Sequence, residues 1–298
     1  MNKPDALPGI RATLVQLRSF EAVARLGAVG KAAAHLHLAQ PTVSMQLREL
    51  AANTGLQLFE PAGRGLRLTE EGALLRDTVC ELFAVWQRFE DELANRRGLK
   101  SGLLRLAAVT TTEYFLPELL GPFAQAHPGI DIQLAVENRD AVVRRLRDGG
   151  AELAVMMMPP TDVPLLRRPL LENPLVLVAP RSHPLAGRKS IALARLAKEP
   201  RLAREEGSGT RLATDQFLSS RGIVWEPRMA LGSNEALKHA VAAGLGLAVL
   251  SRHTLGAEHP GLIELKAVGF PIRRQWFVVW HKERRLSRAA EALLAAWP

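Results

Sequence analysis

Apolar residues recur at helical spacing through the first part of the chain. They lie three or four positions apart over residues 14–24, Gly27 ends this run, and a second run covers 31–36. Pro41 stands where the first turn of a helix tolerates proline and opens a third run. Alternating apolar residues over 58–68 then predict a hairpin. Helix, helix, turn, helix and hairpin predict a winged helix-turn-helix over residues 1–70.

The third helix carries a run of polar side chains that suits the edges of DNA bases. In a winged helix-turn-helix this helix enters the major groove and the hairpin tip touches the phosphate backbone. The candidate base-contacting residues are Gln40, Thr42, Ser44, Gln46 and Arg48, and the candidate wing contact is Arg64. A small helical bundle with a solvated polar face has the same spacing, so the pattern alone leaves both interpretations open.

A long helix is predicted next, over the linker region 71–100. Thr69 supplies an N-cap, and Glu70 and Glu71 complement the helix dipole. Its apolar residues are spaced 4-3-4-3-4, as in a coiled-coil seam: Leu75, Val79, Leu82, Trp86, Phe89 and Leu93. A second copy of the chain is the predicted cover for this seam, and packing on its own chain is the alternative.

From residue 101 onward, short apolar runs alternate with helical stretches, which predicts an α/β domain with largely parallel strands. The predicted strands are Leu103–Val109, Ile130–Val136, Leu153–Met157, Leu175–Ala179, Gly246–Leu250 and Trp276–Trp280. The predicted helices are Pro117–Ala126, Asp140–Asp148, Arg211–Ser220, Asn234–Ala243 and Ser287–Trp297.

Three segments of this domain place hydroxyl groups at a helix start, where free backbone N–H groups favour an anion. Simple N-capping explains each one alone, but three that converge in one cleft would form an anion site. The candidate residues are Thr110, Thr111, Thr112, Ser208, Thr210, Ser233 and Asn234.

Composition and charge narrow the classes of function. The 298 residues are 47% hydrophobic and 23% charged, which predicts a folded chain of two domains. A single cysteine, Cys80, excludes an internal disulfide and fits the cytoplasm. The longest apolar run, 240–250, is too short for a bilayer. The net charge of +9 favours polyanionic or anionic partners.

Enzyme signatures are missing from the sequence. Neither H-E-x-x-H, C-x-x-C nor G-x-S-x-G occurs, so we expect no catalytic residues, no metal and no cofactor. An enzyme using Ser208 or Thr210 as nucleophile would lack an adjacent base in the sequence. A solute-binding module whose helical front end only dimerises is a second alternative.

Several strings resemble a known family over essentially the whole chain. "HLHLAQPTVSMQL", "LFEPAGRGLRLTEEG" and "LGSNEALKHAVAAGLGLAVLSRHTLG" resemble the LysR-type transcriptional regulators. "VTTTEYFLPELL", "LENPLVLVAP", "GSGTR" and "GFPIRRQW" resemble the subgroup that regulates Calvin-cycle carbon-fixation operons.

The resemblance implies a regulator that binds a dyad-related promoter site in double-stranded DNA as a homodimer or homotetramer, acts with RNA polymerase and has no membrane partner. Its effector domain, 101–298, would resemble a type 2 periplasmic binding protein, with lobe I at 101–174 and 271–298 and lobe II at 175–270. A small anionic metabolite would bind between the lobes.

The resemblance also assigns roles to individual residues of this sequence. Gln40, Pro41, Thr42 and Ser44 match the family's major-groove contacts, and Arg64 matches its wing contact. Asn138 and Arg139 join Thr111, Ser208, Thr210 and Ser233 at the interlobe positions.

Two departures from the family pattern stand out. Ala39 replaces a Ser or Thr before Gln40, so a helix cap worth about 1 kcal/mol is missing. Met157 and Met158 replace residues expected to be more polar, and they predict a partly apolar wall for the effector site.

Overall fold

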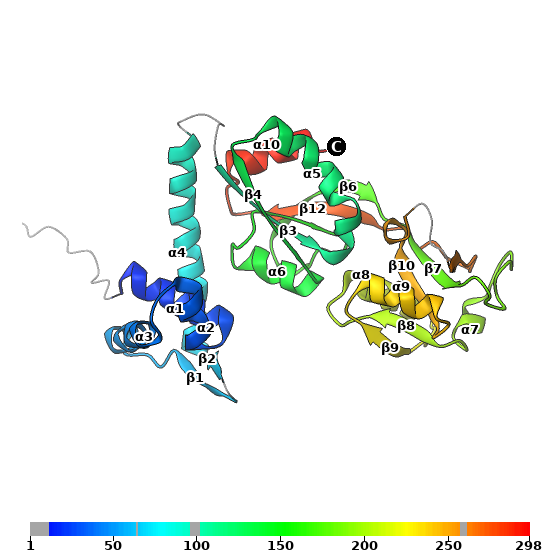
Figure 1. The fold of residues 1–298 in the computed structure, drawn as a ribbon, viewed down its shortest axis with the longest axis horizontal. Helices are drawn as coiled ribbons and strands as arrows, with labels where there is room; N and C mark the ends of the chain where they lie inside the picture. Colours follow the sequence, from blue (N-terminus) through cyan, green and yellow to red (C-terminus); the bar gives the residue numbers. More distant parts are fainter. Residues whose placement is uncertain (1–11, 64, 96–101, 257–260) are drawn as a thin grey trace, which may run out of the picture. The chain divides into compact units, whose positions relative to one another are not determined.

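The computed structural model describes residues 12–63, 65–95, 102–256 and 261–298, without the side chains of 87, 88 and 90–95. The chain forms two compact units, Met1–Phe89 and Glu90–Pro298. Figure 1 labels their helices and strands.

The first unit is the predicted winged helix-turn-helix, and its elements are α1 (Leu14–Leu26), α2 (Val29–Leu36), α3 (Gln40–Thr54), β1 (Phe59–Ala62), β2 (Gly65–Leu68) and α4 (Glu70–Asn95). Thr13 begins α1 with a capping box, and Gly27 ends it in the left-handed conformation at φ 70°. Ala39 makes no side-chain bond at the start of α3, as its sequence predicts. Phe20, fully buried, packs its ring 5.3 Å from that of Phe59 and joins α1 to the wing.

Helix α4 begins with the predicted cap, because the Thr69 hydroxyl accepts the Gly72 N–H at 3.0 Å. The predicted seam then divides in two. Val79 is 1% exposed in the core around Phe20, so its assignment to a dimer contact was wrong, and Leu75 packs partly against the same core. A small winged domain needs this first part of the linker helix to complete its own core.

The second unit contains two sheets, each flanked by helices (Figure 1). The first sheet has the order β4-β3-β5-β12-β6. Its strands are β3 (Gly102–Val109), β4 (Ile130–Glu137), β5 (Leu153–Met156), β6 (Leu165–Glu172) and β12 (Gln275–His281). The helices that accompany it are η1 (Thr110–Tyr114), α5 (Leu116–Ala126), α6 (Arg139–Arg147) and α10 (Arg288–Ala296).

The second sheet has the order β11-β7-β10-β8-β9. Its strands are β7 (Leu175–Pro180), β8 (Arg201–Arg204), β9 (Pro227–Leu231), β10 (Leu247–Ser251) and β11 (Leu262–Glu264). The helices that accompany it are α7 (Leu193–Leu196), α8 (Gly209–Ser219), α9 (Asn234–Ala242) and η2 (Arg252–Thr254).

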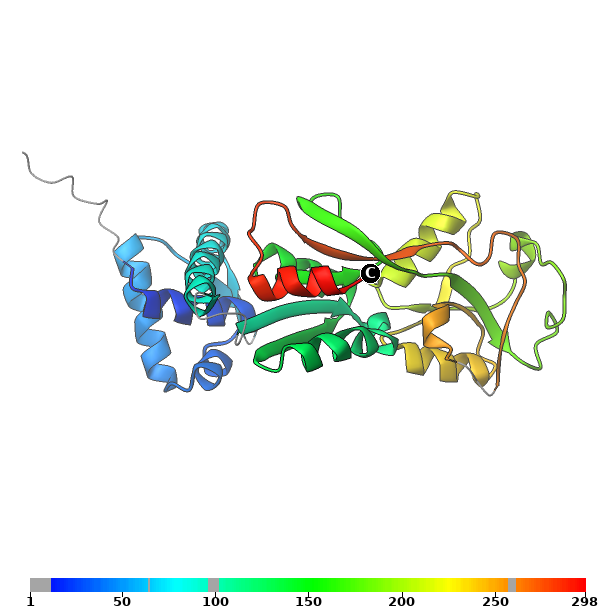
Figure 2. The ribbon, with the colours of Figure 1, turned by 90° about the horizontal axis from the view of Figure 1, so that it is seen from above.

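The chain passes between the two sheets twice, at neighbouring points. Asn173 N–H donates to the Arg274 carbonyl at 2.8 Å, and Leu175 and Ile272 exchange two backbone hydrogen bonds. Figure 2 shows these two segments side by side. Their mutual bonds tie the connections between the lobes into one antiparallel pair.

The predicted parallel arrangement was only half right. β3 runs parallel to β4 and β5, and β8 runs parallel to β9 and β10, but β7 and β12 pair antiparallel to their neighbours. Because the chain crosses between the two sheets twice, each sheet includes strands from segments that are far apart in the sequence. The periodicity of apolar residues does not indicate whether such a strand runs parallel or antiparallel to its neighbours.

Four strands have no counterpart in the predicted set: β6, β8, β9 and β11. β8 explains why, because Arg201 and Arg204 interrupt its apolar pattern although all four of its residues are buried. Arg201 donates to the Trp225 carbonyl at 2.7 Å and pairs with Asp215. From the sequence alone an arginine predicts an exposed position, because its burial depends on partners from other segments.

Candidate functional site

The recognition helix α3 presents one exposed face. Gln40, Pro41 and Arg48 are exposed, while Thr42 and Ser44 are half-buried. Arg48 also folds back along the helix, donating from Nε to the Ser44 carbonyl at 3.3 Å. These groups can meet a DNA surface without disturbing the core of the unit.

Gln46 departs from the predicted polar face. Its Oε1 accepts a hydrogen bond from the buried Ser19 hydroxyl of α1 at 2.5 Å, so this side chain joins two helices. Met45, which is not among the predicted contacts, is 50% exposed. Arg64, the predicted wing contact, lies outside the described residues.

The later part of α4 leaves large apolar side chains uncovered within its unit. Leu82, Trp86 and Phe89 of the predicted seam are 43%, 53% and 51% exposed, and Val85 beside them is 54% exposed. The Leu93 side chain lies outside the described residues. We call the group Leu82, Val85, Trp86 and Phe89 the α4 stripe.

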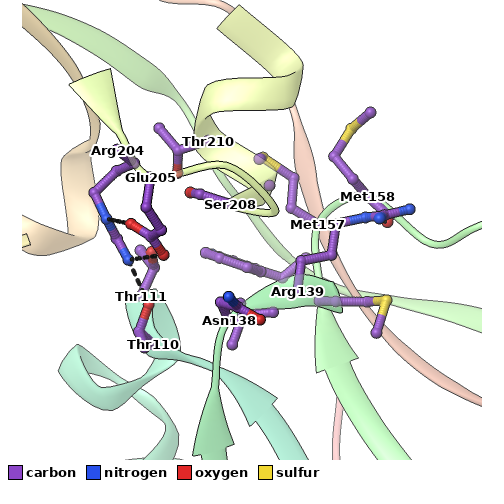
Figure 3. A pocket seen from close by; sticks show the side chains of 14 residues that line it. Thr110, Thr111, Asn138, Arg139, Met157, Met158, Arg204, Glu205, Ser208 and Thr210 are labelled. Carbon is purple, nitrogen blue, oxygen red and sulfur yellow. Dashed lines mark hydrogen bonds and ion pairs between the residues drawn. The ribbon is translucent and has the colours of Figure 1, made fainter. Parts of the chain in front are cut away.

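A pocket lies between the two sheets of the second unit, and Figure 3 shows the side chains that line it. Two of the three predicted helix starts converge there, together with the two positions carried over at the start of α6. The predicted residues in its wall are Thr110, Thr111, Asn138, Arg139, Ser208 and Thr210. Met157 and Met158 form part of the same wall, as their position after β5 predicts.

The hydroxyl groups of this pocket are shielded from solvent. Thr111, Ser208 and Thr210 are 4%, 6% and 5% exposed. Ser208 precedes α8 without capping it through its side chain. Gly207 holds the turn before it at φ 79°, where an added Cβ would lie 2.7 Å from the Asp140 carboxylate. The left-handed φ favours glycine at this point of close approach between the lobes.

Sequence analysis missed the most deeply buried charged group in the pocket. Arg204, 2% exposed, pairs with Glu205 through Nε at 2.8 Å and Nη2 at 3.0 Å (Figure 3). It also donates to the Thr110 hydroxyl at 3.1 Å and to Asn234 Oδ1, so it links the two lobes. Its position three residues before Gly207, the first residue of the Gly-Ser-Gly-Thr turn, was the only signal in the sequence.

Arg139, predicted as a counter-charge, already has partners. Its Nε donates to the Met158 carbonyl at 2.6 Å, and its Nη1 lies 2.9 Å from Asp140. Asn138 caps α6 by accepting the Ala141 N–H at 2.9 Å. Both residues line the pocket while also holding the local backbone.

Three predicted residues do not line the pocket. Thr112 is fully buried and donates to the Val109 carbonyl at 2.8 Å. Ser233 is exposed and caps α9 by accepting the Ala236 N–H, so capping alone accounts for its side chain. Asn234 stands behind the wall, where it bonds to Arg204 and to Thr111.

Trp276 adds a donor that sequence analysis also missed. It lines the pocket at 1% exposure, and its indole Nε1 has no hydrogen-bond partner among the described residues. A buried indole N–H without an acceptor is unfavourable, and a ligand oxygen would satisfy it.

A further bond joins the lobes beside the pocket. Tyr114 donates its hydroxyl to Glu235 at 2.5 Å, and the ammonium of Lys238 lies 5.0 Å from its ring. Burial, followed by this hydrogen bond to the carboxylate, raises the pKa of Tyr114 well above its usual value. Tyr114 therefore stays neutral and remains a donor across the physiological pH range.

Two family models match the chain in succession. Residues 14–73 match the bacterial regulatory helix-turn-helix protein of the lysR family, and residues 97–297 match the LysR substrate binding domain. The chain belongs to the LysR family. It is a DNA-binding transcriptional regulator, and the predicted resemblance is confirmed.

Relatives of this LysR-family chain are named as transcriptional regulators, one of them of the RuBisCO operon. The RuBisCO operon transcriptional regulator of Allochromatium vinosum is 44% identical, over 94% of this chain and 93% of its own. The transcriptional activator CmpR of Synechocystis sp. is 41% identical, over 95% and 94%. These names match the predicted subgroup.

Among solved structures, the regulatory domain of Synechocystis CcmR in complex with 2-PG is similar to the second unit of this LysR-family chain. The two share 41% identity with a TM-score of 0.63, over 65% of this chain and 95% of that one. Within the described residues of this chain, no helix is long and apolar enough to cross a bilayer.

Proposed function

We propose that this LysR-family regulator controls a carbon-fixation operon in the cytoplasm, and that a small anionic metabolite bound between its lobes changes how it acts on promoter DNA. The RuBisCO operon regulator and CmpR, which match nearly the whole chain, support the target. The 2-PG complex of CcmR supports an anionic effector.

The interlobe pocket carries this proposal. Thr111, Ser208 and Thr210 line one space together with Trp276, whose indole N–H has no partner among the described residues. All four are donors, and the first turn of α8 adds backbone N–H groups and a favourable dipole end. A carboxylate or phosphate matches this set, whereas a neutral ligand would leave several donors without an acceptor.

Free space in the pocket is small, which connects binding to conformational change. The centre of a water-sized sphere can occupy only about 10 Å³, roughly one water molecule. A ligand therefore enters only if the lobes or the wall side chains move, and it must bind the widened state more tightly. Operator DNA and ligand then alter each other's affinity by the same factor.

DNA recognition is proposed for the exposed face of α3. Gln40, Pro41, Ser44 and Arg48 are the candidate contacts, and Thr42 completes the family motif. The α4 stripe is the proposed dimer contact, because two half-sites of a dyad-related operator require two recognition helices. Tetramer formation and contact with RNA polymerase remain part of the proposal through the family resemblance.

Calorimetric titration of the full chain with 2-PG tests the effector assignment. Thr111→Val and Ser208→Ala each remove a buried donor, so we expect affinity to fall about tenfold. Ser233→Ala is the matched control, since this hydroxyl lies outside the pocket, and it should leave affinity within about twofold. Binding of 2-PG untouched by the first two substitutions would move the site elsewhere.

A further inference from the structure

A second concave region lies on the second unit, separate from the interlobe pocket except for the shared wall of Met157 and Met158. It is an open groove of about 880 Å³, close to the upper size of small-molecule sites. Its lining comes from the turn after β5, from β6 and β12, from both connections between the lobes, at Pro174 and Pro271, and from single residues of α8 and η2. We call it the arginine groove.

Positive charge dominates the arginine groove. Arg167, Arg252, Arg273 and Arg274 line it, against one carboxylate, that of Glu172. Arg252 is neutralised by Glu264, 2.7 Å away. Within the part of the chain that the structure describes, no ion pair neutralises the other three arginines. Like charges that share a groove repel one another, and a bound anion removes this repulsion.

One atom of Arg274 also lacks an acceptor. Its Nε is shielded from solvent and has no hydrogen-bond partner among the described residues. A guanidinium donor without an acceptor is unfavourable, and an oxyanion supplies the planar acceptor geometry that guanidinium groups bind best.

Apart from Gln216 and Gln275, the rest of the lining is apolar. The Arg167 guanidinium carbon lies 5.3 Å from the ring centroid of Phe277, so the ring orients the charge. Pro159, Pro174 and Pro271 border the same space. The backbone pairing of Leu175 with Ile272 fixes the two connections that carry the latter two prolines. This concave, partly apolar shape suits a small molecule better than the convex backbone of a DNA duplex.

We propose that the arginine groove is a second anion site, which takes a small phosphate compound carrying at least two negative charges. Arg273 and Arg274 hold the phosphate oxygens, and Arg167 above Phe277 closes one side. The site differs from the interlobe pocket in that Arg167, Arg273 and Arg274 have no ion-pair partner among the described residues, whereas Arg139 and Arg204 of the pocket are paired with Asp140 and Glu205. It stands independently of the proposed effector assignment.

Titration of the full chain with inorganic pyrophosphate at about 0.15 M salt tests the proposal. Arg273→Gln with Arg274→Gln should weaken binding tenfold or more, because two charged donors are lost. Arg181→Gln with Arg188→Gln is the matched control, since it removes the same charge from exposed positions outside the groove, and it should change binding less than twofold.

The same titration on Ser208→Ala separates the two sites. Pyrophosphate binding at the arginine groove should survive this substitution. Three results would overturn the proposal: binding unchanged by the Arg273 and Arg274 pair, an equal loss in the control pair, or binding abolished by Ser208→Ala alone. If the Arg273→Gln and Arg274→Gln variant binds operator DNA more weakly but binds pyrophosphate as the parent chain does, the groove is a DNA contact. That result would also overturn the proposal.

Discussion

The recognition helix and the interlobe pocket offer their polar groups in opposite ways. On α3 the candidate contacts are exposed or half-buried, and only Gln46 is committed to another helix. In the pocket several polar side chains also hold the fold: Asn138 and Arg139 hold the local backbone, and Arg204 bonds to Thr110, Glu205 and Asn234. Substitution on α3 should therefore change binding alone, whereas substitution in the pocket should change binding and stability together.

The largest effect should follow from the α4 stripe, which is exposed like the face of α3. Leu82→Glu with Phe89→Glu should weaken the dimer by about 4 kcal/mol, roughly a thousandfold, because two large apolar contacts become charges. Sedimentation as a function of concentration measures this. The unit itself should keep its thermal stability, since both side chains are uncovered within it.

Leu74→Glu adds the same charge at a position that is 71% exposed and outside the stripe, so it serves as control. A double variant that stays dimeric at micromolar concentration would place the interface elsewhere.

Arg204→Ala should be the most damaging single change in the pocket. It removes the cation from a buried network and leaves Glu205, Asn234 and Thr110 without it, at a cost of about 3 kcal/mol. Urea unfolding of the full chain measures the loss. Arg188→Ala, at an exposed position, should cost less than about 0.5 kcal/mol. Equal stability of the two variants would contradict the network's structural role.

Ser44→Ala tests the recognition helix α3, where we expect substitution to change DNA binding alone. If Ser44 contacts a base edge, specific operator binding should lose about 1–3 kcal/mol while random DNA and thermal stability change little. Arg64→Ala should weaken binding to both DNAs and make the salt slope shallower by about one unit. Equal losses of Ser44→Ala on both DNAs would remove the assignment.

The smallest effect concerns the ion pair of Glu137 with Arg145, which is less exposed than Arg48 of α3 and more exposed than Arg204 of the pocket. Bidentate hydrogen bonds from Arg145, both at 2.7 Å, hold the pKa of Glu137 below its usual value. A lowered folded-state pKa gives stability that is present above the unfolded pKa and is lost as pH falls through the folded pKa.

Glu137→Gln should cost less than about 1 kcal/mol at neutral pH, because solvent screens the pair. Its difference from the parent chain should shrink on acidification below pH 4.5, as followed by thermal unfolding. A difference that grows in acid would contradict the lowered pKa.

The sequence located the elements but not all of their partners. The five helices predicted after residue 101 are present within two residues, since amphipathic spacing and capping are local signals. Val79 shows the limit, because a seam residue buried in its own unit and one left exposed have the same periodicity. The helix starts show it again: Ser208 and Ser233 look alike in sequence, and only Ser208 lines the pocket.

By itself, then, the amino-acid order determined the winged helix-turn-helix, the long α4, the α/β alternation and the family. Short-range spacing and strings of contiguous residues encode all of these. Tertiary structure decided strand direction, the buried Arg204 network, the unpartnered Trp276 donor and the grouping of Arg167, Arg273 and Arg274. These features depend on segments far apart in the chain, and the free energy of burying a charge depends on partners that no local pattern names.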